Sequence, residues 1–190
     1  VECSSLGPLP FVRMNASLYR VRRATLEDLG TLRPLWESMR LPVAELEKRL
    51  TEFQVAEGAD GKIVGAVGIQ LVARQARIHS EAFLDFAATD AVRPMFWERI
   101  QVLLVNHGIT RLWTQEQAPF WKQHGLVPAT PDVLKKLPAY SPAIPGEWLS
   151  LKLKDEESIV SLEKELALFM ESEKQRTARA FQQARVLKFI

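Results

Sequence analysis

The chain has 190 residues, of which 47% are hydrophobic and 25% are charged. This length supplies one sizeable core or at most two small ones, which excludes a machine of many domains. The formal net charge of +2 is too small to indicate nucleic acid or an anionic membrane as an obligatory partner. The single cysteine, Cys3, excludes an intrachain disulfide and a cysteine-rich metal site. A reducing, cytoplasmic compartment is the simplest expectation.

Glycine is scarce. The chain has nine glycines, against roughly thirteen for an average usage of about 7%. None lies between Gly68 and Gly108. Any motif that needs glycine in that interval is therefore missing.

Residues 1–18 are expected to form a leader outside the folded domain. The first thirteen residues lack the basic and apolar regions of a secretory signal. Met14 follows them and is the expected native start, with a genuine flexible N-terminus as the alternative. The uncharged stretch Ile63–Ala73 is shorter than the roughly 20 residues that a bilayer core requires, so it predicts a buried strand and no membrane span.

The first predicted elements are a strand and two helices. Tyr19–Ala24 alternates apolar and charged residues, which predicts a half-buried strand. Thr25, followed by two acidic residues, is typical of a helix start, and an apolar stripe at helical spacing continues to Met39. Pro42 predicts the start of a second helix, whose buried side reaches Phe53.

A three-stranded antiparallel meander is predicted next. Residues 53–59 and 62–74 are extended runs joined by Asp60-Gly61, a dipeptide that favours a tight hairpin because both residues tolerate positive φ. A third run, Arg77–Phe86, follows after a short turn.

Met95–His107 predicts a helix that ends at Gly108, and Ile109–Thr114 predicts a short strand. A short helix is expected from Pro119 to Gly125.

The last part of the chain changes in composition. Residues 128–145 contain five prolines, so we expect no regular structure there beyond a helical turn over 132–137. Glu147–Lys154 alternates again and predicts a last strand. Residues 155–190 contain neither glycine nor proline and predict one long helix. Its apolar seam consists of Ile159, Leu162, Leu166 and Phe169.

Two segments are similar to patterns of a known family. Residues 114–126 read Thr-Gln-Glu-Gln-Ala-Pro-Phe-Trp-Lys-Gln-His-Gly-Leu and are similar to Asn-x-x-Ala-x-x-Phe-Tyr-x-x-x-Gly-Phe, with Phe120, Gly125 and Leu126 in register. Residues 21–28 are similar to an Arg-x-Ala-x-x-x-Asp motif. Together with the order of elements, these segments resemble the GNAT superfamily of N-acetyltransferases.

The resemblance implies an α+β, three-layer fold. Its central sheet would be mixed, mostly antiparallel and flanked by helices, with the long C-terminal helix added. The GNAT-like domain would span residues 19–154, and residues 155–190 would form a helical extension outside the resemblance.

The resemblance also implies a site for acetyl-CoA where the fourth and fifth strands splay apart. In the family, a Gln/Arg-x-x-Gly-x-Gly/Ala loop at a helix start holds the pyrophosphate, because a helix N-terminus offers unpaired N–H donors. Here that loop falls at residues 88–93, where Ala88, Ala91 and Arg93 replace the pattern residues. The implied cofactor-binding residues are Phe86, Ala87, Ala88, Ala91, Val92, Arg93, Thr114, Phe120 and Trp121.

Arg93 has two interpretations. Its guanidinium could supply the phosphate contact that the glycine backbone no longer makes. Alternatively, Arg93 and Pro94 belong to an ordinary helix start that binds no nucleotide.

The candidate catalytic residues are Glu81, Asp85 and Tyr140. Amine acetylation needs a base for the substrate ammonium and often an acid for the leaving thiolate. The family's tyrosine acid is replaced by Trp121, so Tyr140 is a candidate replacement acid. Glu81 and Asp85, together with His79, are predicted to share one face of a strand because even numbers of residues separate them.

Glu81 is the preferred base, because apolar neighbours in mid-strand would raise the pKa of its carboxyl group. The alternative is an ordinary ion pair with Arg74 or Arg77. His107 and His124 each precede a helix-ending glycine and are interpreted as caps. No metal site is indicated.

Three functions follow as hypotheses. The first is an acyl-CoA-dependent N-acetyltransferase that transfers an acetyl group by direct attack of a primary amine, from a small molecule or a peptide. The alternative is a GNAT-like pseudoenzyme that serves as a binding or assembly module and forms a homodimer through its C-terminal helix. The third is nucleic-acid binding by the end of the chain. Residues 173–190 contain five basic residues and one acidic residue, Glu173. A solvated helix face is the simpler interpretation of that basic end.

Overall fold

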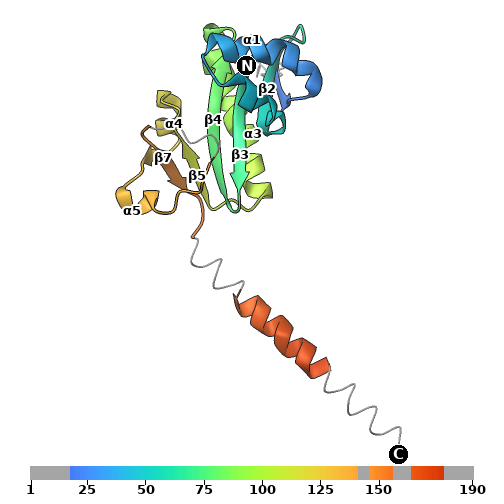
Figure 1. The fold of residues 1–190 in the computed structure, drawn as a ribbon, viewed down its shortest axis with the longest axis vertical. Helices are drawn as coiled ribbons and strands as arrows, with labels where there is room; N and C mark the ends of the chain where they lie inside the picture. Colours follow the sequence, from blue (N-terminus) through green and yellow to red (C-terminus); the bar gives the residue numbers. More distant parts are fainter. Residues whose placement is uncertain (1–17, 141–145, 156–163, 178–190) are drawn as a thin grey trace, which may run out of the picture.

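A computed structural model describes residues 18–140, 146–155 and 164–177. Within them, a seven-stranded sheet has the order β1-β2-β3-β4-β5-β7-β6 (Figure 1). The strands are β1 (Tyr19–Arg23), β2 (Phe53–Gly58), β3 (Ile63–Val72), β4 (Gln75–Phe83), β5 (Arg111–Thr114), β6 (Val127–Pro128) and β7 (Leu149–Lys152). The helices are η1 (Leu26–Asp28), α1 (Leu29–Ser38), α2 (Val43–Glu47), η2 (Leu50–Glu52), η3 (Phe86–Ala88), α3 (Thr89–Asn106), α4 (Pro119–Gln123) and α5 (Pro131–Leu134).

The sheet is mixed and mostly antiparallel. Only the pairing of β4 with β5 is parallel among the strand pairs of the described residues. One apolar cluster packs α3 and α4 against the sheet, and a second packs α1 and α2 against β2 and β3. The predicted three-layer α+β architecture is therefore confirmed.

Several turns form where the sequence predicts them. The Asp60-Gly61 turn joins β2 to β3, with Gly61 at φ +77°. Gly108 (φ +60°) follows α3, and Gly125 (φ +89°) follows α4. At these positive φ values glycine avoids the clash of a Cβ atom, which explains why the helices end there.

Two elements differ from the prediction. Helix α3 begins at Thr89, well before Met95, and contains Pro94 within its length. The sequence suggested a later start because proline is rare inside helices. The two-residue strand β6, Val127–Pro128, lies at the sheet edge, where a proline costs no ladder hydrogen bond.

The N-terminal segment that resembles Arg-x-Ala-x-x-x-Asp is built around an ion pair. Arg22 donates from Nη1 and Nη2 to the two oxygens of Asp28, at 2.7 and 2.8 Å. Its Nε donates to Glu57 of β2 at 2.6 Å. Asp28 also accepts the backbone N–H of Thr25 at 2.7 Å, which closes the start of η1. The hydrogen bonds from Arg22 lower the pKa of Asp28, so this carboxylate ties the first helix to the sheet in its charged form.

Replacing Asp28 by alanine should lower the free energy of unfolding by about 2–3 kcal/mol, because the half-buried Arg22 loses its main partner. Urea denaturation at pH 7 measures this loss. The exposed neighbour Glu27 provides the control: Glu27→Ala should change stability by less than about 0.5 kcal/mol. Equal effects of the two substitutions would contradict the role given to Asp28.

The described part of the C-terminal segment, residues 164–177, is helical. Two predicted seam residues in it, Leu166 and Phe169, are 62% and 60% exposed. The other two, Ile159 and Leu162, lie outside the described residues. No helix within the described ranges is both long and apolar enough to cross a membrane.

Candidate functional site

The two parallel strands separate at one end of the sheet. β4 and β5 pair from Gln75 with Arg111 to Ile78 with Thr114. Beyond this point β5 ends, whereas β4 continues to Phe83 and pairs with β3 on its other side. We call the space between the end of β5 and residues 79–83 of β4 the wedge. Within the described sheet, the backbone groups of β4 that face the wedge have no partner on β5.

A β-bulge interrupts β4 beside the wedge. Ala66 of β3 pairs with Ala82, but Gly68 pairs with His79, so β4 carries one extra residue between them. Ser80 occupies the bulge with φ +52°. The extra residue reverses the alternation of side chains along the strand.

The bulge separates two residues that the sequence placed together. The ring of His79 packs edge-on against Phe53 and bonds Glu52 at 3.1 Å. Glu81 points instead toward α3. The prediction that His79, Glu81 and Asp85 share one strand face is therefore wrong. Moreover, β4 ends before Asp85, whose carboxylate accepts the N–H of Ala87 at 2.8 Å and caps η3.

The carboxylate of Glu116 occupies the wedge. The hydroxyl of Thr114 donates to the carbonyl of Ile78 at 3.0 Å and accepts the backbone N–H of Glu116 at 3.0 Å. Glu116 then turns back, and its Oε1 accepts the backbone N–H of Glu81 at 3.1 Å. The backbone N–H of Ser80 lies nearby and also helps to lower the pKa of this carboxylate. Glu116 therefore takes the Glu81 donor that β4 presents to the wedge and covers the neighbouring N–H of Ser80.

Burial raises the pKa of Glu116 from its ordinary value of 4.5 to about 7. The nearby carboxylate of Glu81 raises it further, while the two backbone N–H groups and Arg77 lower it. A group with this pKa changes its charge near neutral pH.

The side chain of Glu81 is held by α3. Arg93 donates to both of its carboxylate oxygens, at 2.9 and 3.0 Å, and lies 5.2 Å from the ring centre of Phe83. Burial raises the pKa of Glu81, and the hydrogen bonds from Arg93 oppose that shift. The ion-pair partner of Glu81 is thus Arg93. The sequence alternative had instead paired this carboxylate with Arg74 or Arg77.

The residues proposed for the phosphate loop lie at the start of α3. Ala88 and Val92 are buried in the core, while Ala87 and Ala91 are exposed. Phe86 is 68% exposed. Within this segment, therefore, the outward-facing Ala87, Ala91 and Phe86 are accessible to a ligand, whereas Ala88 and Val92 serve packing.

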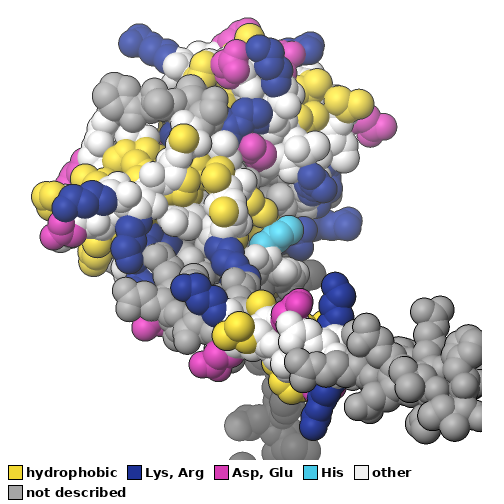
Figure 2. Space-filling model, turned by 60° about the horizontal axis from the view of Figure 1, so that its bottom comes forward, with side chains coloured by type: hydrophobic (Ala, Val, Ile, Leu, Met, Phe, Trp, Pro, Cys, Tyr) yellow, Lys and Arg dark blue, Asp and Glu magenta, His cyan; other side chains and the backbone are white. Residues whose placement is uncertain are grey.

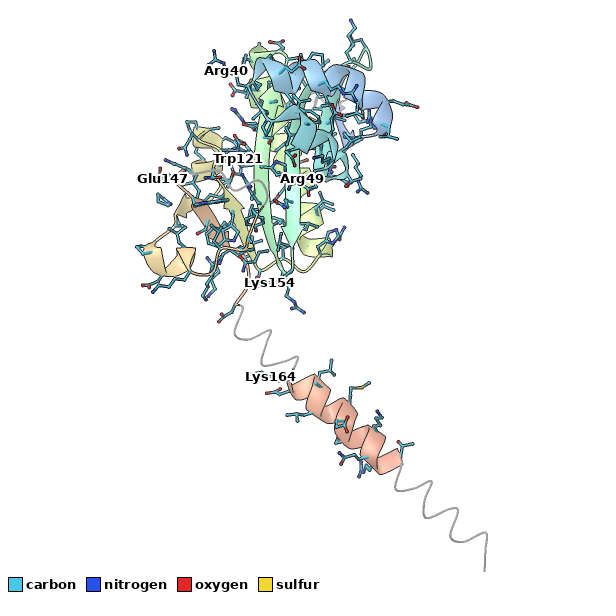
Figure 3. All side chains as sticks on the ribbon, in the orientation of Figure 1. Arg40, Arg49, Trp121, Glu147, Lys154 and Lys164 are labelled. Carbon is cyan, nitrogen blue, oxygen red and sulfur yellow. The ribbon has the colours of Figure 1, made fainter. Side chains whose placement is uncertain are left out.

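Trp121 is a core residue. It is completely buried and packs edge-on against Trp97 of α3, with ring centres 6.3 Å apart (Figure 3). Its neighbour Phe120 is half-buried and lies against the ring of His124, with centres 4.0 Å apart. The Nδ1 atom of His124 lies 2.8 Å from the carbonyl of Phe120, so this histidine closes the end of α4, as its position before Gly125 predicts.

A buried polar cluster lies on the sheet face opposite α3. Glu52 contacts His79 and, at 2.6 Å, Nη2 of Arg49, which is labelled in Figure 3. Burial lowers the pKa of His79, so its neutral form is favoured despite Glu52. Gly68 faces this ring: a Cβ atom there would lie 2.3 Å from the imidazole. The glycine is therefore required by the close approach of His79.

Tyr140 lies apart from the other two candidate catalytic residues. It is buried, stacks on Trp148 with ring centres 6.0 Å apart, and lies beside the guanidinium of Arg77. Arg77 and Ile78 alternate on β4, and Ile78 belongs to the α3 core, so Arg77 and Tyr140 lie on the opposite face from the Glu81 side chain. Burial raises the pKa of Tyr140, which makes it a weaker acid.

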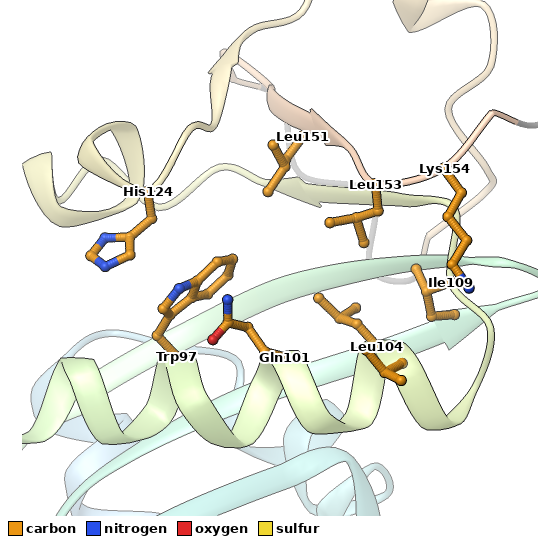
Figure 4. Close-up of a pocket in the computed structure, with 9 residues that line it drawn as sticks. Trp97, Gln101, Leu104, Ile109, His124, Leu151, Leu153 and Lys154 are labelled. Atoms are coloured by element: carbon orange, nitrogen blue, oxygen red, sulfur yellow. The ribbon is translucent and has the colours of Figure 1, made fainter.

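A separate apolar pocket of about 370 Å³ lies near the C-terminal half of α3 (Figure 4). Trp97, Gln101 and Leu104 of α3 face Leu151 and Leu153 across it. Because Ile109 and Lys154 also line it, the pocket lies toward the start of β5, at the end of the sheet away from the wedge. On the molecular face in Figure 2, Lys and Arg side chains are interspersed with hydrophobic and acidic ones. Within the described ranges, no three His, Cys, Asp or Glu residues are grouped closely enough to hold a metal ion.

The sequence interpretation missed Glu116 and the cluster around His79. One signal for Glu116 was present: it lies two residues after a predicted strand, and ligands of sheets with parallel strands bind beyond the carboxyl ends of those strands. No local signal marked the bulge, because Ser80 is not a glycine.

The fold is shared with many solved acetyltransferases. Rv2747 from Mycobacterium tuberculosis, in complex with CoA and NLQ, is 21% identical; the match covers 70% of this chain and 99% of that one, with a TM-score of 0.56. An acetyltransferase of the GNAT family from Staphylococcus aureus is 12% identical, with 72% and 99% covered and a TM-score of 0.58. N-acetylglutamate synthase from Neisseria gonorrhoeae, with CoA and L-arginine, is 18% identical, with a TM-score of 0.60. That match covers 74% of this chain but 34% of the synthase.

No family model and no curated protein matches the chain. At these identities the structural likeness establishes the fold, and the chain has the fold of the GNAT acetyltransferases.

Proposed function

We propose that the protein is an acyl-CoA-dependent N-acyltransferase that transfers an acetyl group from acetyl-CoA to a primary amine of a small molecule or peptide. The observation that carries this proposal is the backbone N–H of Glu81, which β4 directs into the wedge with the N–H of Ser80 close beside it. Fixed backbone donors of this kind stabilise the oxygen of an acyl group during transfer. Solved structures with the same fold contain CoA.

The start of α3 supports the same proposal. Ala91 lies exposed in the first turn of an 18-residue helix, at the end where the helix dipole favours an anion. We propose that this turn holds the pyrophosphate without the usual glycines, while Arg93 remains bound to Glu81.

The wedge as it stands does not fit an acyl group, because the carboxylate of Glu116 already accepts the N–H of Glu81 and lies near that of Ser80. We therefore assign no catalytic step to acetyl-CoA. The residues of this chain supply the backbone donor of Glu81, the helix start and the carboxylates of Glu81 and Glu116 that border the wedge.

Titration calorimetry with acetyl-CoA tests the proposal. The wild-type protein should bind acetyl-CoA at pH 8 with a submillimolar Kd. Ala91→Asp should weaken binding at least tenfold, because its carboxylate would repel the pyrophosphate. The substitution should not destabilise α3, because aspartate is favourable at a helix start. Val102→Asp, which adds the same charge at an exposed position in mid-α3, is the control. Absence of binding at millimolar acetyl-CoA, both by the wild type and by Glu116→Ala, would contradict the proposed function.

The second candidate is an assembly module without catalytic activity. The exposure of Leu166 and Phe169 on the helix of residues 164–177 favours it, because two such apolar faces can bury each other. The occupied wedge and the absence of a phenol at Trp121 are consistent with lost catalysis.

Sedimentation velocity at increasing concentration tests this second candidate. A dimer formed through the helix should be converted to a monomer by Leu166→Glu, whereas Lys164→Glu on the same helix should leave it intact. If the wild-type protein remains a monomer at high concentration, the assembly module is excluded.

A further inference from the structure

Glu116 is held in the wedge by contacts at both ends. Its backbone N–H donates to Thr114, which is itself bonded to Ile78, and its carboxylate accepts the N–H of Glu81 in β4. The side chain thus bridges the separated ends of β4 and β5 where their ladder stops. It replaces the hydrogen bonds that a continued β5 would have made.

No covalent bond or salt bridge fixes this carboxylate in the described structure. The acceptor is a flexible side chain on the segment between β5 and α4, and the donors are fixed in the strand. A ligand carbonyl that enters the wedge would compete for the same donors.

We propose that Glu116 is a displaceable plug of the wedge, which occupies the Glu81 donor and covers the adjacent N–H of Ser80 in the free protein and must withdraw before an acyl group can enter. This inference rests on the proposed function, and it adds regulation of the site by proton concentration.

The direction of the pH effect follows from the groups that face Glu116. Arg77 and Glu81 of β4 are the charged groups near it. Arg93 of α3 is bonded to Glu81 and so lies next to that neighbour. The residues that precede it, Thr114 and Gln115, are uncharged.

In the wedge the carboxyl group keeps its proton until about pH 7, whereas in water it ionises near its ordinary value of 4.5. Withdrawal therefore releases a proton, and a rise in pH through this window favours the open wedge.

Acetyl-CoA binding by four proteins, measured by calorimetry at pH 6 and pH 8, tests the plug. Glu116→Ala should bind at least tenfold more tightly than the wild type at pH 6, and the gap should narrow at pH 8. Glu116→Gln keeps an acceptor that cannot ionise, so it should bind more weakly than the wild type already at pH 6, and this difference should widen at pH 8. Glu98→Ala, which removes an exposed acid of α3, should match the wild type throughout. The phosphates of acetyl-CoA also titrate between pH 6 and pH 8, but their effect on affinity is the same for all four proteins. It therefore cancels when the proteins are compared at one pH.

A second readout needs no ligand. The amides of Ser80 and Glu81 should exchange their hydrogens at least tenfold faster in Glu116→Ala than in the wild type or in Glu98→Ala. Unchanged exchange at these two amides would overturn the plug. Equal acetyl-CoA affinity of the wild type and Glu116→Ala at both pH values would overturn the plug while leaving the proposed function intact. Absence of binding by all four proteins would overturn the proposed function, and the plug with it.

Discussion

Replacing Trp121 by alanine should lower the free energy of unfolding by about 3–5 kcal/mol. The indole is completely buried beneath α4 and packs against Trp97 and Phe120. Its removal leaves a cavity between α3 and α4 that a five-residue helix cannot easily close. Chemical denaturation followed by circular dichroism measures the loss.

Trp121→Phe is the matched control. Phenylalanine retains most of the apolar ring, and the indole N–H that it removes has no hydrogen-bond partner among the described residues. We therefore expect it to cost less than half as much as alanine. A loss below about 1 kcal/mol for Trp121→Ala would show that the position does not serve the core.

The second large effect is a pH dependence of stability that comes from Glu116. The unfolded chain ionises this group near pH 4.5, whereas the folded protein keeps the proton until about pH 7. Between these values the unfolded state has lost a proton that the native state retains. The free energy of unfolding should therefore fall as pH rises through this window, by up to about 3 kcal/mol, and level off above it.

Urea denaturation from pH 4 to pH 9 measures this fall, and Glu116→Gln should remove it because an amide does not titrate. The difference between the two proteins isolates Glu116 from the other titrating groups. Curves of the same shape for both proteins would contradict a raised pKa at this position.

The parts of the fold that depend on local signals could be predicted from the sequence. The Asp60-Gly61 hairpin needs two residues that tolerate positive φ, and Gly108 ends a helix for the same reason. The parallel pairing of β4 and β5 makes the sheet mixed, and the family resemblance implied a mixed, mostly antiparallel sheet.

The arrangement of the site could not be predicted in the same way. Strand alternation placed His79 and Glu81 on one face, but an extra residue at Ser80 turns them to opposite faces. That bulge depends on pairing with β3, where Gly68 leaves room for the His79 ring. Sequence spacing cannot register such a contact between strands.

Glu116 was missed for a related reason. Its role depends on where β5 stops relative to β4, which is a property of the assembled sheet. Two of the three candidate catalytic residues, Glu81 and Tyr140, also took their positions from this assembly. Each pairs with an arginine on a different face, Glu81 with Arg93 and Tyr140 with Arg77.

The most direct measurement is the change in backbone amide signals of ¹⁵N-labelled Glu116→Ala when acetyl-CoA is added. The largest shifts should occur at Ser80 and Glu81 and at the first turn of α3, residues 89–92. If instead the signals of these residues stay fixed while those around the pocket at Trp97 and Leu153 move, acetyl-CoA does not enter between β4 and β5.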